Sequence, residues 1–410
     1  MKVAYLTGRY PSVSHTFVLH EARALRERGL DVEPYSIWRS DAADLLAEVD
    51  RDEAARTYNL LPPHRLDWAR AHLRALRHGP RAYLGALGRS LRLSQPTPRG
   101  VGMAGLWFAE SIVLWDRCRD SRVEHIHVHL NGTAPSVALI ATVFAEEVGE
   151  GTTSWSLTVH GPSEFYDVER ERLPEKARGA DAVVCISDFA RSQLMGMVDE
   201  RQWAKLHVVH CGIDSGVFAP GARDGDAPPG SLHVLTVGRL TQVKGQAVLL
   251  DAIAQARADG LEVTATLVGD GPKRAELERL RDGLDLGPHV EFAGAVGHDE
   301  IRAHYQRADL FCISSFAEGV PVVLMEAMAM ELPVVAPAVM GIVELIEDGK
   351  QGLLVRPGRP GLLAGAISAL ARDPTRRMEL GRAGRKKVLD EFTIDGAADL
   401  LAELFAAQRR

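Results

Sequence analysis

Residues 310–330 constrain the fold most, because they read as a buried strand, a loop and a helix in succession. The apolar run at 310–313 is typical of a strand in a covered sheet. Pro321 suits a first helical position, because its φ is fixed and its missing N–H is not needed there. The order predicts that Glu318 lies on the loop at the mouth of the helix. Glu326 then points inward from about the second helical turn.

The same corner offers two kinds of contact to a ligand. Glu318 and Glu326 supply carboxylates for hydroxyl groups, and Gly319 lets a ligand approach the backbone closely. The free N–H groups of the first helical turn favour an anion such as phosphate. These features predict a site for a sugar nucleotide. The alternative is a solvated loop carboxylate and an ordinary helix glutamate, because two glutamates at this spacing are common.

The length and charge of the chain narrow the classes of protein. A chain of 410 residues is too long for one ordinary core, so two domains are expected. The net charge of -7 argues against a nucleic-acid binder. The four cysteines lie far apart, so neither a zinc site nor a disulfide framework is indicated, and reduced thiols in the cytoplasm fit best. Residues 1–6 read as a strand rather than a signal peptide, and no apolar run is long enough to span a bilayer.

The first half begins with a βαβ pattern. Strands are expected at 2–7 and 31–37, with an amphipathic helix at 17–28 between them. This order implies a parallel sheet with a ligand site at the carboxyl ends of its strands. The loop after the first strand carries small polar residues, for which binding and simple solvation are equally open readings. These residues are Gly8, Ser12, Ser14, His15 and Thr16.

Histidines mark two strands of this half. His125, His127 and His129 alternate, so all three are expected to share one face of a strand. A metal triad is one reading, but a strand covered on both faces is a poor place for an open metal site, so metal is disfavoured. His129, followed by Asn131, more plausibly faces a ligand. His160 ends the strand at 155–159 and is favoured as functional by its position, although a structural role stays open.

A basic amphipathic segment occupies residues 66–93. Leucines and alanines recur there at helical spacing, beside a stripe formed by Arg70, Arg74, Arg77 and Arg81. In an acidic protein, such a segment could rest on an anionic membrane surface. A solvated helix face is the favoured alternative, because charge runs usually have that role.

A second half begins after a linker at 220–230, which is rich in Pro, Gly, Asp and Ala. Asp224 and Asp226 in this linker are discounted as metal ligands, because no strand underlies them. The strand at 232–237 then leads into a loop with Arg239 and Lys244. Two cations at a strand's carboxyl end can neutralise a departing diphosphate without a metal. Two surface cations would be the reading if Glu318 and Glu326 were absent.

These motifs resemble the retaining glycosyltransferases of family 4, which have the two-domain GT-B fold. The resemblance covers nearly the whole chain, and residues 9–18 are similar to the start of exopolysaccharide and colanic-acid-type members. The residues that carry it most strongly are Gly238, Arg239, Lys244, Gly245, Glu318 to Pro321, Glu326, Gly341, Ile342, Glu344 and 352–355.

The resemblance implies a role for each matching residue. Arg239 and Lys244 would grip the donor diphosphate, and Glu326 would bind the ribose. Glu318 would hold hydroxyls of the transferred hexose, and His160 would lie against that sugar near the reacting carbon. The catalytic residues expected are therefore His160, Arg239, Lys244 and Glu318. The donor-binding residues expected are Gly238, Arg239, Lys244, Asp270, Phe292, Gly294, Glu318, Gly319, Val320, Pro321 and Glu326. The acceptor-binding residues expected are Gly8, Ser14, His15, Thr16, His129, Asn131 and His160.

The expected architecture is α/β, with two Rossmann-like domains whose parallel sheets face a central cleft. An acceptor-binding domain is expected at 1–218, joined by a C-terminal helix at about 394–410 that crosses back to it. A donor-binding domain is expected at 231–393.

The expected activity is metal-independent transfer of a hexose, with retention, from a UDP- or GDP-sugar. The acceptor expected is a saccharide, a glycolipid or a small glycoside. No cofactor and no nucleic-acid partner are expected, and the protein is placed in the cytoplasm with peripheral contact at the inner face of the membrane. A non-catalytic subunit that binds sugar nucleotide, or a GT-B epimerase, is the alternative.

Overall fold

The computed structural model describes the chain apart from residues 13–15, 43–44, 46, 151–153, 222–229 and 409–410. The chain forms two compact units. The first contains Met1–His210 and Ala397–Arg410, and the second contains Cys211–Gly396. The predicted linker aspartates Asp224 and Asp226 lie outside the described residues.

The described part of the first unit is built on a sheet of seven parallel strands, in the order β3-β2-β1-β4-β5-β6-β7. Its strands are β1 (Lys2–Arg9), β2 (Asp31–Trp38), β3 (Tyr58–Leu61), β4 (His125–His129), β5 (Ser154–Val159), β6 (Ala182–Cys185) and β7 (Leu206–Val208). Its helices are α1 (Thr16–Glu27), α2 (Glu48–Arg56), α3 (Arg65–His78), α4 (Pro80–Leu93), α5 (Pro98–Asp120), α6 (Thr133–Val148), α7 (Val168–Glu171), α8 (Leu173–Gly179), α9 (Asp188–Met195) and most of α17 (Ile394–Ala407).

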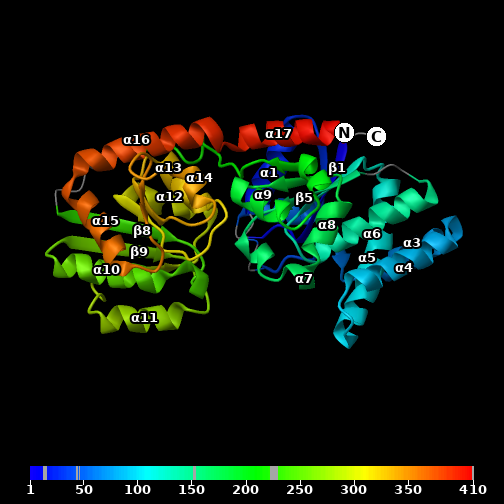
Figure 1. Ribbon diagram of the computed structural model, residues 1–410, viewed down its shortest axis with the longest axis horizontal. Coiled ribbons are helices and arrows are strands. Elements are labelled where there is room, and N and C mark those ends of the chain that lie inside the picture. Colours follow the sequence, from blue (N-terminus) through cyan, green and yellow to red (C-terminus); the bar gives the residue numbers. More distant parts are fainter. Residues whose placement is uncertain (13–15, 43–44, 46, 151–153, 222–229, 409–410) are drawn as a thin grey trace. The chain divides into compact units, whose positions relative to one another are not determined.

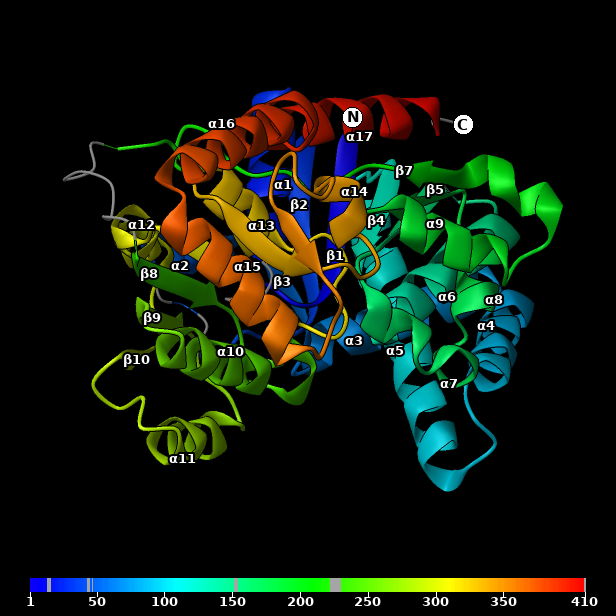
Figure 2. The ribbon, with the colours of Figure 1, turned by 60° about the vertical axis from the view of Figure 1, so that its left-hand side comes forward.

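The described part of the second unit holds six parallel strands in the order β10-β9-β8-β11-β12-β13. Its strands are β8 (Ser231–Val237), β9 (Glu262–Val268), β10 (Val290–Gly294), β11 (Leu310–Cys312), β12 (Val334–Pro337) and β13 (Leu353–Val355). Its helices are α10 (Gln246–Ala258), α11 (Arg274–Gly283), α12 (His298–Arg307), α13 (Val322–Ala329), α14 (Ile342–Leu345), α15 (Pro360–Arg372) and α16 (Pro374–Glu391). The pair α10 and α15 covers one face of this sheet, and α12 and α13 cover the other (Figures 1 and 2).

Each sheet therefore has the doubly wound order expected of a Rossmann-like domain, which confirms the predicted fold class. The strand order reverses between β1 and β4 in the first unit, and between β8 and β11 in the second. In such sheets, ligands bind in the crevice outside the carboxyl ends of the two strands at the reversal. The two reversal points thus locate the candidate site of each unit.

The basic segment at 66–93 differs from its predicted arrangement. Gly79 divides it into α3, which packs on α5, and α4, which packs on α5 and α6. The buried stripe consists of small residues such as Ala71, Ala75, Ala82 and Ala86. A solvated arginine face would place the periodic leucines on the buried side, but they are exposed. The exposed leucines are Leu66, Leu73, Leu76, Leu84 and Leu91.

The last helix completes the core of the first unit. Phe405 on α17 is fully buried, and its ring lies 4.8 Å from that of His125 and 4.9 Å from that of His127. The predicted return of the C-terminal helix to the first domain agrees with this packing. Within the described chain, no helix combines the length and the apolar character needed to cross a bilayer.

Candidate active site

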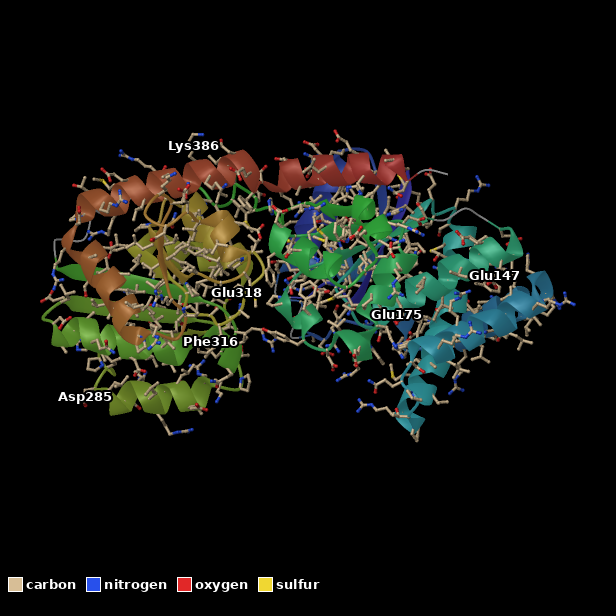
Figure 3. The ribbon with its side chains drawn as sticks, in the orientation of Figure 1. Glu147, Glu175, Asp285, Phe316, Glu318 and Lys386 are labelled. Atoms are coloured by element: carbon tan, nitrogen blue, oxygen red, sulfur yellow. The ribbon has the colours of Figure 1, made fainter. Side chains whose placement is uncertain are left out.

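The reversal point of the second unit brings the predicted cation and carboxylate together. Lys244 follows β8 and Glu318 follows β11, and the Lys244 Nζ lies 2.6 Å from Oε1 of Glu318. Ser315 donates a second hydrogen bond of 2.6 Å to the same oxygen. Glu318 is buried and Lys244 is partly exposed, so the carboxylate is fixed while the ammonium group can reach a ligand. Figure 3 labels Glu318 and Phe316 on this loop.

A left-handed glycine lets these two loops touch. Gly245 has φ +62°, and a Cβ added there would lie 2.3 Å from the carbonyl oxygen of Ser314. The Phe316 N–H donates to the Val243 carbonyl at 2.8 Å, and the Ser314 hydroxyl donates to the Gly245 carbonyl at 2.9 Å. A larger residue than glycine at this position would separate the loop of Lys244 from that of Glu318.

The loop that precedes α13 is held from its other side. A Cβ added at Gly341 would lie 2.4 Å from the carbonyl oxygen of Gly319, so these two loops are also in close contact. Val320 is buried beneath this contact. The sequence predicted Pro321 as the first helical residue of α13. It is instead the N-cap residue, a difference of one position. The N–H groups that open α13 lie directly after the loop.

Glu326 lies on α13 and is buried, as its predicted inward position requires. The Tyr305 hydroxyl donates to Glu326 Oε2 at 2.7 Å. Burial raises the pKa of Glu326 to about 7, and the hydrogen bond from Tyr305 opposes that rise. The carboxyl therefore titrates near neutral pH, where a change of its surroundings would decide whether it accepts hydrogen bonds as a carboxylate.

The remaining predicted donor residues lie at the carboxyl ends of β8, β9 and β10. Gln246 donates to the Arg239 carbonyl at 3.0 Å, and the Gly238 N–H donates to the Val268 carbonyl at 2.9 Å. The Leu240 N–H donates to the carbonyl of Asp270 at 2.9 Å, and the Gly269 N–H donates to that of Gly294 at 2.7 Å. These bonds join the three strand ends into one edge. Phe292 instead packs against the hydrophobic core, with Arg281 over its ring.

The first unit places His160 at the carboxyl end of β5, next to its reversal point. Glu164 accepts hydrogen bonds from the backbone N–H groups of His160, Gly161 and Asn131, at 2.5, 2.9 and 2.6 Å. Its carboxylate ties the loop after β5 to the loop after β4. Residues 162–165 form a 3₁₀ helix with Gly161 as its N-cap residue.

A buried lysine supports the same two loops. Lys176 on α8 donates to Asn131 Oδ1 at 2.9 Å and to the Gly132 carbonyl at 2.7 Å. Burial lowers its pKa to about 8. Among the described residues, Asn131 Nδ2 and Thr7 Oγ1 are buried without a hydrogen-bond partner. They lie at the ends of β4 and β1, where polar groups without partners suit a ligand with hydroxyl groups.

The three alternating histidines share one face, as predicted, and all are buried. Ligand atoms of Glu21, His127 and His129 lie within 4.8 Å of one another, which is close enough for a metal ion. The two ring nitrogens of His127, however, lie 2.7 Å from the Ser156 hydroxyl and 2.9 Å from that of Thr158. Burial lowers the pKa of His127. Both ring nitrogens of His127 are therefore satisfied by hydroxyl groups of the neighbouring strand.

The other predicted acceptor residues are partly described. Gly8 belongs to β1, which continues to Arg9 rather than ending before a loop at Gly8 as expected. Thr16 begins α1. Ser14 and His15 lie outside the described residues. Sequence reasoning did not identify Glu164, Lys176 or Tyr305, although a carboxylate three residues after Gly161 is a signal for capping.

Comparison with known proteins gives relatives along the whole chain. The family model described as glycosyl transferases group 1 matches residues 231–373. The chain is 29% identical to the putative colanic acid biosynthesis glycosyltransferase WcaL of Escherichia coli, over 99% of this chain and 100% of that protein. It is 30% identical to the GDP-mannose-dependent alpha-(1-6)-phosphatidylinositol monomannoside mannosyltransferase of Mycolicibacterium smegmatis, over 66% of this chain and 70% of that protein.

The fold has solved counterparts. The structure of Anabaena HepE in complex with UDP and glucose superimposes with a TM-score of 0.73 at 19% identity, covering 99% of this chain and 100% of that one. Sucrose-phosphate synthase from Thermosynechococcus elongatus gives 0.71 at 22% identity, with 99% and 100% covered. The fold is thus GT-B, as the sequence motifs predicted. Together with the relatives and the family model, these likenesses show that the chain belongs to the group 1 glycosyltransferases.

Proposed function

We propose that this glycosyltransferase moves a hexose from a nucleoside diphosphate donor to an acceptor hydroxyl, with retention of anomeric configuration and without a metal ion. The observation that carries the proposal is the contact of Lys244 with Glu318 at the reversal point of the second sheet. It sets a cation for phosphate beside a carboxylate for sugar hydroxyls. The N–H groups at the start of α13 add positive potential to the same place.

The proposed reaction needs little covalent chemistry from the protein. The bond from the anomeric carbon to the phosphate oxygen breaks, and Arg239 and Lys244 stabilise the charge that develops on the diphosphate. The acceptor oxygen forms a bond to the same face of the sugar, and its proton passes to the leaving phosphate. His160 of the first unit is assigned to the transferred sugar through the family resemblance.

The named relatives support a proposal for the donor class. HepE binds UDP together with glucose, and the mycobacterial relative is named as GDP-mannose-dependent. A UDP- or GDP-sugar is therefore proposed here, with Glu326 on the ribose. The relatives named for colanic acid and amylovoran biosynthesis support a saccharide or glycolipid acceptor. All four cysteines are buried and free, which suits the reducing cytoplasm as the place of action.

Donor binding is tested by thermal stabilisation with UDP-, GDP- and ADP-sugars, each with and without EDTA. A ligand that binds only the folded state raises the melting temperature by mass action. One nucleotide class is expected to stabilise the protein, and EDTA is expected to change nothing. A requirement for metal would contradict the metal-free mechanism. Binding without transfer to any acceptor would favour a non-catalytic subunit, and conversion of the donor alone would favour an epimerase.

The role of Lys244 is tested by substitution. Lys244→Ala is expected to lower turnover by roughly a hundredfold or more, by analogy with loss of one oxyanion donor. Lys387→Ala is the matched control, because Lys387 on α16 is also partly buried and paired with a glutamate, Glu391, yet lies on a helix remote from the strand ends. Turnover near that of the wild type in the Lys244 variant would contradict the assigned role.

We further propose that α3 and α4 contact an anionic bilayer. Each helix turns its alanine stripe to α5, and α4 also packs on α6, so the outer faces of both helices point away from α5. By helical geometry, these outer faces carry Leu73 and Leu84 together with exposed arginines. Residues 65–93 contain seven arginines and one acidic residue, Asp67. Exposed leucines interleaved with arginines are typical of helices that lie in the plane of a membrane interface.

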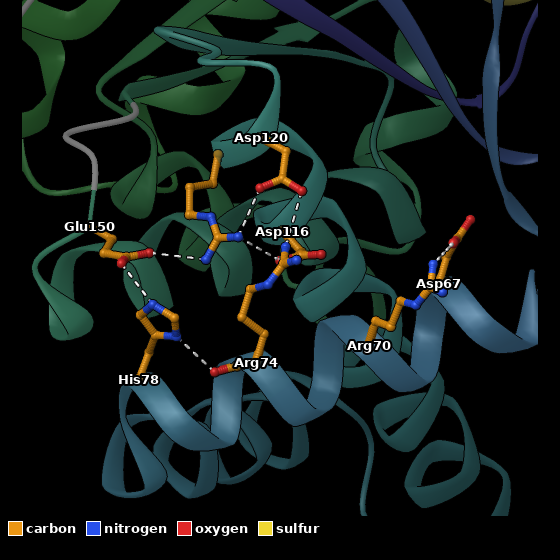
Figure 4. A network of polar contacts seen from close by, with 8 residues as sticks. Asp67, Arg70, Arg74, His78, Asp116, Asp120 and Glu150 are labelled. Carbon is orange, nitrogen blue, oxygen red and sulfur yellow. Dashed lines mark hydrogen bonds and ion pairs between the residues drawn. The ribbon is translucent and has the colours of Figure 1, made fainter.

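The basic residues of α3 and α4 have two roles. Arg74 points inward and pairs with Asp116 at 2.7 Å and with Asp120 at 3.0 Å, which fastens α3 to α5 (Figure 4). His78 contacts Glu150 at 2.8 Å in the same network. The arginines at 70, 77, 81 and 92 are exposed instead. Their charge complements anionic headgroups. Each basic residue near such a surface contributes about 1 kcal/mol of attraction.

A further inference from the structure

A chain of buried polar side chains reaches His160 from within the first unit. Glu21 on α1 is buried, and the Tyr5 hydroxyl donates to its Oε1 at 2.6 Å. His129 Nε2 lies 3.1 Å from the same oxygen. The other ring nitrogen of His129, Nδ1, lies 2.9 Å from Nε2 of His160. The chain Glu21, His129 and His160 therefore joins a helix, a strand end and the loop after β5.

The hydrogen-bonding capacity of these groups fixes where the protons lie. An ionised carboxylate only accepts, so His129 must turn a protonated Nε2 to Glu21. His129 Nε2 makes no hydrogen bond among the described residues, so its 3.1 Å contact with Glu21 Oε1 is an electrostatic one. A neutral His129 then has an unprotonated Nδ1, which accepts from Nε2–H of His160. His160 is thereby held with its proton on Nε2.

We propose that Glu21 is a positioning residue that acts through His129 to hold the ring and the proton of His160. This inference rests on the proposed function, in which His160 lies against the transferred sugar. With Nε2 protonated, Nδ1 of His160 is the unprotonated nitrogen of the ring. Glu164 holds the backbone of His160, whereas Glu21 acts on the ring through His129.

The neighbouring contacts show why the carboxylate serves this purpose. His127 has hydroxyl partners for both ring nitrogens, from Ser156 and Thr158, and needs no charge to fix its orientation. His129 has His160 on one nitrogen and Glu21 on the other. In the described residues around this pair, Glu21 is the acidic group in contact with the histidine that touches His160. Loss of its charge would leave two tautomers of the histidine pair nearly equal in energy.

The test compares a variant that removes the charge of Glu21 with a variant that removes a hydrogen bond to Glu21. Glu21→Gln keeps the size of the side chain but loses its charge, and it is expected to lower kcat by roughly tenfold or more with little change in KM for the donor. Tyr5→Phe removes a buried hydrogen bond to the same oxygen and keeps the ring that packs against His129, and kcat is expected to stay near that of the wild type. Glu21→Asp, which restores the charge, is expected to recover part of the loss.

A direct measurement keeps the two proposals distinguishable. Nitrogen-15 NMR of histidine-labelled protein, with His160 assigned by its absence in His160→Asn, reports which ring nitrogen carries the proton. The Nε2–H form is expected in the wild type and a mixture in Glu21→Gln. An unchanged tautomer and unchanged kcat in Glu21→Gln would overturn the role of Glu21. A wild-type protein without transferase activity would overturn the proposed function, while the tautomer measurement would still decide the relay.

Discussion

At the scale of single residues, three buried glutamates show how partners decide the state of a carboxyl group. Glu164 accepts from three backbone N–H groups, and Glu326 accepts from Tyr305. Glu110 on α5 is fully buried, and neither of its carboxyl oxygens has a hydrogen-bond partner among the described residues. A buried carboxyl without partners is expensive to ionise, so Glu110 stands apart from the two that hold loops or ligands.

Glu110→Gln is expected to stabilise the protein, and more so as pH rises. Burial raises the pKa of Glu110 to about 8 from its ordinary 4.5. The folded state holds the proton of Glu110 more tightly than the unfolded chain does. The contribution of this group to the free energy of unfolding is therefore greatest below pH 4.5 and falls as pH rises toward 8. Glutamine does not titrate, so its advantage should grow by about 1.4 kcal/mol per pH unit within that window.

Melting temperatures at pH 5 and pH 8 measure this effect. Glu262→Gln, at an exposed position of β9, is the control and should show no such trend. An advantage of Glu110→Gln that is the same at both pH values would contradict the explanation by a buried carboxyl.

At the scale of elements, the candidate donor site depends on contact between loops that follow different strands. Gly245 and Gly341 both touch the loop that joins β11 to α13. These contacts fix Glu318 and the first N–H groups of α13 relative to Lys244. A local sequence signal can mark each loop as glycine-rich, but it cannot tell which other backbone the glycine meets.

Gly341→Ala is expected to weaken donor binding by roughly tenfold or more, because the new Cβ would lie 2.4 Å from the Gly319 carbonyl and must displace it. Gly365→Ala is the matched control. A Cβ at Gly365, inside α15, meets nothing within 4 Å, so alanine there is expected to stabilise the helix by about 0.5–1 kcal/mol. Titration of the donor by thermal shift compares the two, and equal donor affinity in both variants would refute the role given to Gly341.

The same scale shows how far the sequence could predict the structure. Residues 310–330 were predictable because the apolar run, the loop glycine and Pro321 all indicate the same strand, loop and helix. Helices α3 and α4 were predictable as helices, but not the face that they bury. Their leucine and alanine stripes are both periodic, and the small alanines win the contact because α5 and α6 approach closely there.

Residue roles that cross elements were hidden for a related reason. His160 follows β5 directly, and Lys244 and Glu318 lie on the loops after β8 and β11, so position along the chain indicated them. Glu21 lies mid-helix, where nothing local distinguishes it from a solvated glutamate, and Glu164 lies in a short 3₁₀ turn, where its spacing from Gly161 is the one local signal. Their partners, His129 and the Asn131 N–H, lie more than 30 residues away or on another element, as the separation of 33 between Asn131 and Glu164 shows.

At the scale of the whole molecule, charge is unevenly distributed. The chain carries a net charge of -7, yet residues 65–93 have seven arginines against one aspartate, a local excess of six positive charges. A protein that is acidic overall is repelled by an anionic bilayer except where such a segment faces it. Binding through α3 and α4 should therefore depend on both anionic lipid and low salt.

Sedimentation with vesicles tests this expectation. The protein is expected to bind vesicles that contain phosphatidylglycerol more strongly than pure phosphatidylcholine vesicles. Leu73→Ser with Leu84→Ser should remove most of that binding, as should Arg77→Gln with Arg81→Gln, because apolar insertion and charge attraction act together. Leu362→Ser, at an exposed leucine of α15 in the second unit, is the control. Binding that survives both double substitutions would place any membrane contact elsewhere.

The path of the chain has a consequence for its synthesis. The second unit is continuous from Cys211 to Gly396, and its entering and leaving segments pair where Ile213 meets Thr393. The first unit lacks Phe405, which packs on His125 and His127, until nearly the whole chain has been made. On the ribosome, the unit that is started first is thus the last to be completed. All seven described strands of its sheet end by Val208, but the part of the histidine face that Phe405 covers has no cover from α17 while the second unit is made.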